Sequence, residues 1–431
     1  MTSRERILAA ISGSPVDHVP LTTWCFGFTP PVHLRWRRAG REVAHWFSMR
    51  MEHIHTLPEP WTLEDDFARV RAWLSAGIDD VLDVSVPWSA GPGVTWADSR
   101  VESGKLDARP VLVREYYTPS GPLRHAVRQT CEQTGPGWVV QADSVPLFED
   151  YNIPRSMEHA VACPGDVDPV AHLYIGPDPE AKQLFAQRMM KVRDFAQRVG
   201  VAVQAWSAFG MDAVVWLTGV EGAVMLAMDE PDAFRRLVSI VAAADRARTE
   251  LVAGEPGVDI LVQRGWYSST DFWSPKLFDR YIFPHVAELA AIAHGHGKKF
   301  AYVMTTGVKI LGPRLADAGV DLLYFVDPVQ DGIPLETARD LLVGRMALVG
   351  GTSALTLQCG DSRRIGDEVR CALDVLAPTG RFILHSVDAI FPDTPWEGVL
   401  AMIEAWRSHQ GIERDAGAPG VTDGEPPCPA Q

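Results

Sequence analysis

Three side chains that could take part in proton transfer or hydrogen bonding follow one short apolar run near the end of the chain. Within Phe382–Pro395 the run ends in His385 and Ser386, and Asp388 comes two residues later. A histidine can act as a general acid or base near neutral pH. His385 and Asp388 are therefore candidates for proton transfer. A strand-end histidine that makes only a hydrogen bond is an equally good interpretation of His385.

The elements that would position these residues recur along the chain. Eight apolar, β-prone runs are each followed by a helical pattern, and the runs are continuous rather than alternating, which is typical of strands buried on both faces. Strands that alternate with helices predict a parallel sheet, and eight units predict an α/β fold, a (β/α)8 TIM barrel. The runs are Val19–Phe26, Ile78–Val86, Val201–Trp206, Val258–Val262, Lys299–Met304, Val320–Phe325, Met346–Gly350 and Phe382–His385.

The helical patterns predict helices between these strands, and a first helix capped by Thr2 precedes them. They cover about 64–76, 178–199, 231–253, 275–296, 307–318, 335–343, 362–376 and 396–408. The repeat pauses between Pro87 and Val201, where Val111–Val127 predicts a β-hairpin around a Pro-Ser-Gly turn. We therefore expect one barrel domain over 1–410, with an insertion at about 88–200 after the second strand. The tail 411–431 is rich in Gly, Pro and acidic residues, and we expect it to be disordered.

Composition narrows the function classes. The 431 residues are 46% hydrophobic and carry a formal net charge of −15, which argues against non-specific binding to nucleic acid or to anionic membranes. Six scattered cysteines without C-x-x-C spacing predict reduced thiols. The N-terminus lacks the apolar segment of a signal peptide, and no uncharged apolar run is long enough to span a bilayer. We expect a cytoplasmic protein that acts on a small molecule. Whether the protein forms a homodimer is a question that the sequence leaves open.

Five of the fourteen tryptophans lie near the ends of predicted strands. They are Trp24, Trp88, Trp206, Trp266 and Trp273. Indole rings that gather at one mouth of a barrel would line a pocket for a planar or bulky ligand. For any single tryptophan, packing in the core is the alternative.

Four segments resemble the uroporphyrinogen decarboxylase superfamily. Ile11–Pro20 is similar to its opening G-x-P-V-D-R-V-P, and Trp273–Phe278 to its S-P-x-x-F segment. Gly219–Pro231 is similar to its middle helix, and Phe382–Pro395 to its last strand. The resemblance spans about residues 3–408 and implies a (β/α)8 barrel. One branch of the superfamily decarboxylates uroporphyrinogen without a cofactor. Another transfers methyl groups between corrinoid proteins and thiols, or from methoxylated or methylated substrates to corrinoids, commonly with zinc.

The zinc ligands of the methyltransferase branch are replaced in this chain. That branch has H-x-C at the end of the fifth strand and a second Cys after the last strand. Here Tyr302, Met304 and Asp388 stand at those positions. A neutral phenol, a thioether and one carboxylate are a poor set for Zn²⁺. We therefore expect no metal, and we expect Tyr302 and Met304 to line the substrate pocket. The decarboxylases have His in place of Asp388, so that branch is not matched there either.

Other positions resemble the decarboxylase branch. Arg37-Arg-Ala-Gly-Arg41 resembles a segment whose arginines bind substrate carboxylates, although an exposed basic helix start is the alternative. Asp83 resembles the aspartate that accepts pyrrole N–H groups and stabilises a protonated ring, although it could simply cap a loop. Ser268 resembles a serine of the substrate cleft. Thr218 stands where the decarboxylases have Tyr.

The sequence supports three hypotheses for function. The leading one is a cofactor-free decarboxylase of a tetrapyrrole or another carboxylated substrate, in which Arg37 and Arg41 bind carboxylates, Asp83 stabilises the cationic intermediate, and His385 or Asp388 transfers protons. The second is a corrinoid-dependent methyltransferase that binds a methoxy or methylamine substrate and has a corrinoid protein as partner. The hairpin around Thr118–Gly121 favours it. The third is a tetrapyrrole- or corrinoid-binding module without catalysis.

Overall fold

The structure is a computed structural model of the whole chain. It describes residues 1–24, 36–38, 41–43, 63–102, 109–129, 145–150, 152–387, 390 and 394–412. Asp388 and nearly all of the predicted tail lie outside the described residues. For Arg37 and Arg41 only the backbone is described.

All eight predicted strands form, and they build one parallel sheet in the order β1-β14-β13-β12-β11-β10-β9-β4. The sheet curls, so that a backbone hydrogen bond from Asp79 N to Leu21 O (2.8 Å) links the strands at its two edges. The fold is therefore an α/β fold with a curled eight-stranded parallel sheet, which is compatible with the predicted barrel. The strands are β1 (Leu21–Thr22), β4 (Val81–Ser85), β9 (Ala202–Ala208), β10 (Ile260–Gln263), β11 (Lys299–Val303), β12 (Leu322–Val326), β13 (Ala347–Ser353) and β14 (Phe382–Val387).

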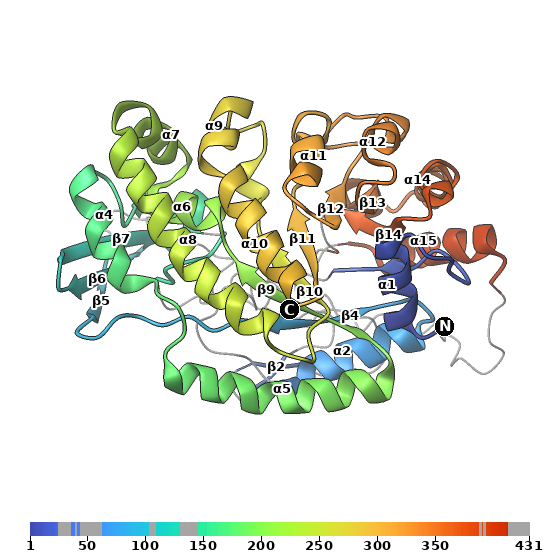
Figure 1. Cartoon of the computed structure of the whole chain (residues 1–431), viewed down its shortest axis with the longest axis horizontal. Helices are drawn as coiled ribbons and strands as arrows, with labels where there is room; N and C mark the ends of the chain where they lie inside the picture. Colours follow the sequence, from blue (N-terminus) through green and yellow to red (C-terminus); the bar gives the residue numbers. More distant parts are fainter. Residues whose placement is uncertain are drawn as a thin grey trace.

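Helices follow the strands and cover the outer face of this sheet (Figure 1). The predicted helical ranges agree with the structure, except that 275–296 is divided into α9 and α10 at Ile282. The helices of this part are α6 (Met211–Thr218), α7 (Val220–Asp229), α8 (Pro231–Ala253), α9 (Pro275–Tyr281), α10 (Phe283–Gly295), α11 (Val308–Asp317), α12 (Leu335–Leu342), α13 (Ala354–Gln358), α14 (Ser362–Leu376) and α15 (Trp396–Gln410).

Each barrel strand has a core on both faces, which explains why its sequence is continuously apolar. One cluster fills the interior and includes Val81, Ile260 and Leu322, whereas a larger cluster lies between the sheet and the helices. Helix α1 (Ser3–Ser12) packs Ile7 and Ile11 into the interior cluster. The side chain of Thr2 caps this helix, as predicted, by accepting a hydrogen bond from Glu5 N.

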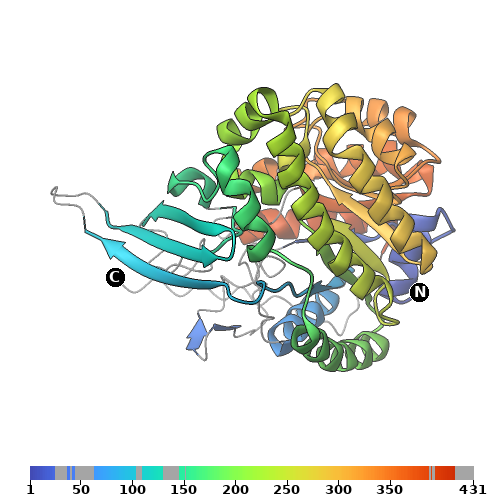
Figure 2. The same cartoon turned by 60° about the vertical axis from the view of Figure 1, so that its left-hand side comes forward.

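A second, antiparallel sheet lies between β4 and β9 in the sequence. It consists of β5 (Thr95–Val101), β6 (Val111–Thr118), β7 (Gly121–Arg128) and β8 (Ser156–Glu158). The predicted hairpin is confirmed, because β6 and β7 pair from Val111 with Arg128 to Thr118 with Gly121. Strands β5 to β7 extend away from the barrel (Figure 2).

The remaining elements complete the segments before β9. They are α2 (Leu63–Ser75), α3 (Asn152–Arg155), α4 (Val167–Leu173), α5 (Pro179–Val199) and the antiparallel pair β2 (Trp36–Arg38) and β3 (Arg41–Val43). Within the described residues, no single helix is long and apolar enough to cross a membrane. Helices α6 and α7 meet the length and composition criteria only as a pair bent by 100°, and every residue of α6 is buried in the fold.

Candidate active site

Asp83 is held in the barrel interior by donors from the neighbouring strand. It lies opposite Gln204 in the register of β4 and β9. Its Oδ1 accepts hydrogen bonds from Gln204 Nε2 (2.6 Å) and from Trp206 Nε1 (2.8 Å), and its Oδ2 lies 3.6 Å from the Arg69 guanidinium. The residue is only 4% exposed. The carboxylate is therefore fixed in orientation, with a cation behind it.

The network continues across the barrel to β12. Gln204 Oε1 accepts a hydrogen bond from the hydroxyl of Tyr324 (3.0 Å). Burial, with a smaller contribution from the Asp83 carboxylate, raises the pKa of Tyr324 well above that of an ordinary tyrosine, so the phenol stays protonated. One amide thus fixes a carboxylate on one strand and a phenol on another.

His385 on β14 faces the same space as a neutral imidazole. Its Nδ1 lies 2.7 Å from the carbonyl oxygen of Ser386, a contact that requires Nδ1 to be the donor and leaves Nε2 as an acceptor. Burial lowers the pKa of His385 to about 4, although the hydrogen bond to Ser386 acts in the opposite direction. At neutral pH this side chain can accept a proton or a hydrogen bond, but it has none to donate from Nε2.

Four aromatic rings form a wall beside these polar groups. The rings of Trp24 and Trp206 stack with centroids 5.1 Å apart, and Trp266 lies 5.6 Å from Trp24. Phe325 lies 6.1 Å from Trp24 and 5.0 Å from the His385 imidazole. Three of the five tryptophans singled out in the sequence therefore gather at this place. Trp88 packs instead against Phe148 and Tyr174, and Trp273 packs against Phe234.

A small cavity lies among these groups. Its volume is about 20 Å³, enough for one water molecule. The buried Thr23 Oγ1 at its edge makes no hydrogen bond. None of its described lining residues carries a positive charge, and Asp83 is the one carboxylate among them. They are Thr22, Thr23, Trp24, Val81, Asp83, Gln204, Trp206, Tyr324, Phe325 and His385.

Comparison with known proteins places this fold in a family. The family model described as uroporphyrinogen decarboxylase (URO-D) matches residues 148–409, more than half of the chain. The chain belongs to this family. Among curated proteins, no sequence matches the chain.

Among solved structures, one with a similar fold is a methyltransferase. A methyltransferase from Methanosarcina mazei is similar with a TM-score of 0.57 at 17% identity, over 95% of this chain and 99% of that one. At this identity the likeness shows the fold alone.

Two of the family positions, Ser268 after β10 and Tyr302 on β11, are in contact. Ser268 Oγ is 2.5 Å from the Tyr302 hydroxyl, and it also donates to Gly265 O (2.6 Å). Tyr302 and Met304 are fully buried. None of Ser268, Tyr302 and Met304 lines the cavity beside Asp83, so their part in substrate binding stays a prediction.

The residues at the zinc position of the methyltransferase branch do not fit a zinc ion. Burial raises the pKa of Tyr302 above its ordinary value, so the phenolate that a metal would need is disfavoured. The thioether of Met304 is a weak ligand for Zn²⁺. Elsewhere in the described part of the chain, no group of three or more His, Cys, Asp or Glu side chains could hold a metal ion.

Thr218 lies apart from the barrel cavity. It ends α6, and its hydroxyl donates to Val214 O (2.8 Å). It lines a separate cleft, between α7 and the antiparallel sheet. The predicted roles of Arg37, Arg41 and Asp388 concern side chains outside the described residues.

Three polar side chains at this end of the barrel were not predicted. Gln204 is a polar residue in an otherwise apolar strand, a signal that could have identified it. For Tyr324 the sequence contains no such signal, because aromatic residues are common in strands. Arg264 lies one residue after β10, and its guanidinium is 4.3 Å from the Trp266 ring and 4.8 Å from the Trp216 ring.

Arg264 also joins two carboxylates. Its Nε donates to Asp212 Oδ2 (3.0 Å), and its terminal nitrogen donates to Asp150 Oδ2 (2.7 Å). Burial raises the pKa of Asp212 to about 7, even with the Arg264 cation beside it. The guanidinium is thus fixed on one face of Trp266, whose ring in turn stacks on Trp24 and Trp206 at the cavity.

Proposed function

We propose that this chain is a methyltransferase that takes a methyl group from a small methylated amine bound at the barrel mouth. The observation that carries the proposal is the chemistry of the cavity: aromatic rings, one oriented carboxylate and no cation among its described lining residues. We propose also that the fold is a complete (β/α)8 TIM barrel, with residues 88–200 inserted after β4.

The cavity favours a positively charged ligand for two reasons. Aromatic faces attract substituted ammonium groups, and a nearby carboxylate adds a charge of opposite sign. A substrate with carboxylate groups would meet Asp83 without a compensating cation among the lining residues. Opening the site to the size of such a ligand requires the aromatic wall to move, since the present volume holds about one water molecule.

The protonation states of the site suit a fully substituted methylammonium group. When the bond between carbon and nitrogen breaks, the electron pair stays on nitrogen, which leaves as a neutral amine and needs no proton. Among the described residues of the site, His385 is neutral and Tyr324 donates its proton to Gln204, so neither is a ready acid, and this reaction requires none. In this mechanism Asp83 would hold the cationic nitrogen, and the aromatic rings would exclude water. The family resemblance implies that a corrinoid protein accepts the methyl group.

Decarboxylation, the leading hypothesis from sequence, is kept as the second candidate. The observation in its favour is Asp83, a buried carboxylate at the strand position where the decarboxylases stabilise a cationic intermediate. However, Asp83 Oδ1 already accepts two hydrogen bonds from protein donors, and Oδ2 faces Arg69. Few of its acceptor positions remain for the converging N–H groups of a tetrapyrrole.

A pair of assays separates the candidates. Purified protein is mixed with added cob(I)alamin and either tetramethylammonium or anisole, and methylation of the corrinoid is followed by absorbance. In parallel, release of CO2 from uroporphyrinogen is measured. We expect methylation from tetramethylammonium, and about 100-fold less of it with Asp83→Asn, because removing one ion-pairing partner at a buried site costs several kcal/mol. Release of CO2 without methylation would establish the decarboxylase. Binding of either compound without turnover would establish a binding module.

A further inference from the structure

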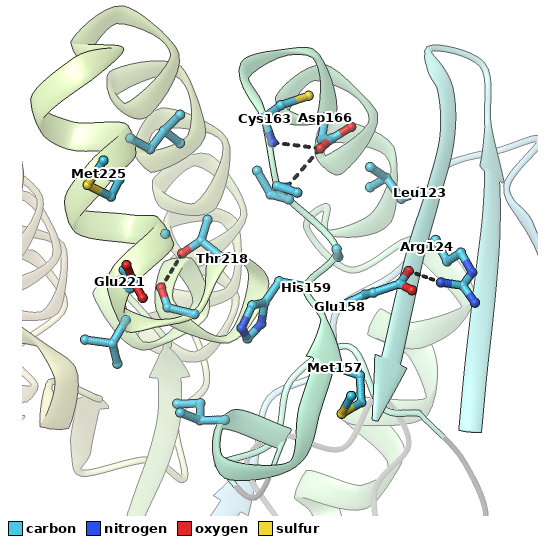
Figure 3. A pocket seen from close by; sticks show the side chains of 18 of the residues that line it. Leu123, Arg124, Met157, Glu158, His159, Cys163, Asp166, Thr218, Glu221 and Met225 are labelled. Carbon is cyan, nitrogen blue, oxygen red and sulfur yellow. Dashed lines mark hydrogen bonds and ion pairs between the residues drawn. The ribbon is translucent and has the colours of Figure 1, made fainter. Parts of the chain in front are cut away.

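A second, larger cleft lies outside the barrel mouth. It has a volume of about 1090 Å³ and shares no residue with the cavity beside Asp83. One wall comes from the antiparallel sheet, with Leu123 and Arg124 on β7 and Met157 on β8 (Figure 3). The opposite wall is α7, with Glu221 and Met225. The cleft therefore joins the segment between β4 and β9 to the barrel.

The charge of the cleft is strongly negative. Four carboxylates line it, Glu115, Glu158, Asp166 and Glu221, against the single guanidinium of Arg124 among the described lining residues. Arg124 pairs with Glu158 and also lies 3.9 Å from Glu115. His159 does not compensate, because burial lowers its pKa and leaves the ring neutral. A ligand that neutralises this site must bring positive charge.

Exposed methionines lie on both walls of the cleft. Met157 is 49% exposed and Met225 is 54% exposed at its walls, and Met228, one turn further along the helix, is 64% exposed. Thioether side chains are apolar and flexible, and they are common on surfaces that adapt to protein partners. Met225 and Met228 form an apolar strip on α7 beside Glu221, and Met157 lies on the opposite wall.

A glycine forms the junction of α6 and α7 at the cleft. Gly219, between α6 and α7, has φ of +72°, and a Cβ placed on it would lie 2.4 Å from Nε2 of His159. No residue but glycine allows this close approach of the imidazole to the start of α7. Since α6 directly follows the carboxyl end of β9, the cleft lies at the end of the barrel to which Trp206 belongs.

We propose that this cleft docks a segment of a partner protein that presents lysine or arginine side chains around an apolar side chain. The acidic groups match the cations, and the methionine strip matches the apolar anchor. The strip reaches beyond the cleft to Met228, further than a single small cation would extend. A second copy of this chain is a poor occupant, because each copy carries a net charge of −15. The inference does not depend on the reaction at the barrel mouth.

A labelled amphipathic peptide tests the proposal with the full-length protein. The probe is a 14-residue helix of Lys and Leu, compared with the same helix carrying Glu in place of Lys, and binding is followed by fluorescence anisotropy at 0.15 M salt. We expect the Lys peptide to bind and the Glu peptide not to bind. Glu221→Lys and Met225→Glu should each weaken it at least 10-fold, whereas Glu180→Lys, on the exposed start of α5, should not.

The outcomes that would overturn the proposal are distinct. Both cleft substitutions are on exposed positions, and an unchanged melting temperature would show that each variant is folded. Equal binding of the Lys peptide to the wild type and to both cleft variants would place its site elsewhere. Displacement of the peptide by 1,6-diaminohexane, with the same dependence on Glu221, would make the cleft a small-molecule site and not a docking surface.

Discussion

At the residue scale, Asp83 is a carboxylate that is buried and yet lines a cavity. Gln204 and Trp206 donate to one oxygen, and Arg69 lies behind the other. These contacts offset the cost of removing the charge from water. They also fix the direction in which the carboxylate faces the cavity. Gln204 also accepts a hydrogen bond from Tyr324, so the positions of these three side chains are linked.

His385 should make stability fall in mild acid. Its pKa in the folded protein is about 4, against an ordinary 6.5, so below pH 6.5 the unfolded chain takes up a proton that the folded chain does not. The contribution is fully present above pH 6.5 and is lost as pH falls to 4, on the order of 3 kcal/mol. His385→Asn keeps a donor for Ser386 O and should lose less stability over this range in urea unfolding. The exposed His296→Asn is the control, and identical pH curves for wild type and His385→Asn would refute the assignment.

Tyr324→Phe should weaken the same network without changing its shape. The substitution removes the donor to Gln204 Oε1 and leaves that buried acceptor unsatisfied. We expect a loss of roughly 1–2 kcal/mol in the free energy of unfolding. Tyr117→Phe removes an exposed hydroxyl that donates to Glu115 (2.9 Å) and should cost less than about 0.5 kcal/mol. Equal costs for the two variants would mean that the bond to Gln204 contributes nothing.

At the scale of elements, Arg264 joins β10, α6 and the segment that holds Asp150. Arg264→Met would leave Asp212, which is fully buried, without its cation. We expect destabilisation of about 3–5 kcal/mol at pH 8. The loss should shrink as pH falls to 5.5, because a carboxyl with a raised pKa becomes neutral by taking up a proton.

Urea unfolding at the two pH values measures this difference. Arg345→Met is the matched control, because it breaks an exposed pair with Asp317 (2.5 Å) and should cost less than about 1 kcal/mol at either pH. A loss in Arg264→Met that does not depend on pH would show that Asp212 does not become the unpaired charge.

The elements were predictable from sequence, whereas their convergence was not. Continuous apolar runs and helical periodicity are local patterns, so all eight strands and the β6–β7 hairpin could be predicted. The bond from Tyr324 to Gln204 depends on which strands curl toward each other, and this is a long-range property. Thr218 lies at the end of α6 and lines a separate cleft, so its predicted part in substrate binding stays a prediction.

At the scale of the whole molecule, the two edges of the curled sheet, β1 and β4, approach each other at a seam. Among the described residues, the backbone hydrogen bond from Asp79 N to Leu21 O joins β1 to the segment just before β4. Side chains reinforce it: Arg6 donates to Asp79 (2.5 Å) and to Asp17 (2.6 Å), and Trp406 Nε1 donates to Val19 O (2.8 Å). Side-chain contacts therefore contribute to the seam, whereas junctions such as β10–β11 and β13–β14 have regular backbone ladders.

Arg6→Met should open this seam. Asp79 is 2% exposed, and without the Arg6 cation its buried charge would be unpaired, at a cost of about 3–5 kcal/mol. Hydrogen exchange should become faster in β1 and β4 before it does in β11. Arg4→Met is the control. Arg4 is on the same helix as Arg6 but pairs with Asp259, so its loss should leave exchange at the seam unchanged. Faster exchange throughout the barrel in Arg6→Met would indicate global destabilisation instead.

The pairing of β1 with β14 also has a consequence for biosynthesis. Leu21 lies beside Leu384, so the first barrel strand to leave the ribosome has its partner in the last one to be made. Until then β1 has no ladder, and the edge of β13 is open to pairing with another chain. A transcript that ends before Phe382 would therefore yield a polypeptide with most of the core sequence and two unpaired edges, prone to aggregation. For this chain, completing translation is a condition for closing the barrel.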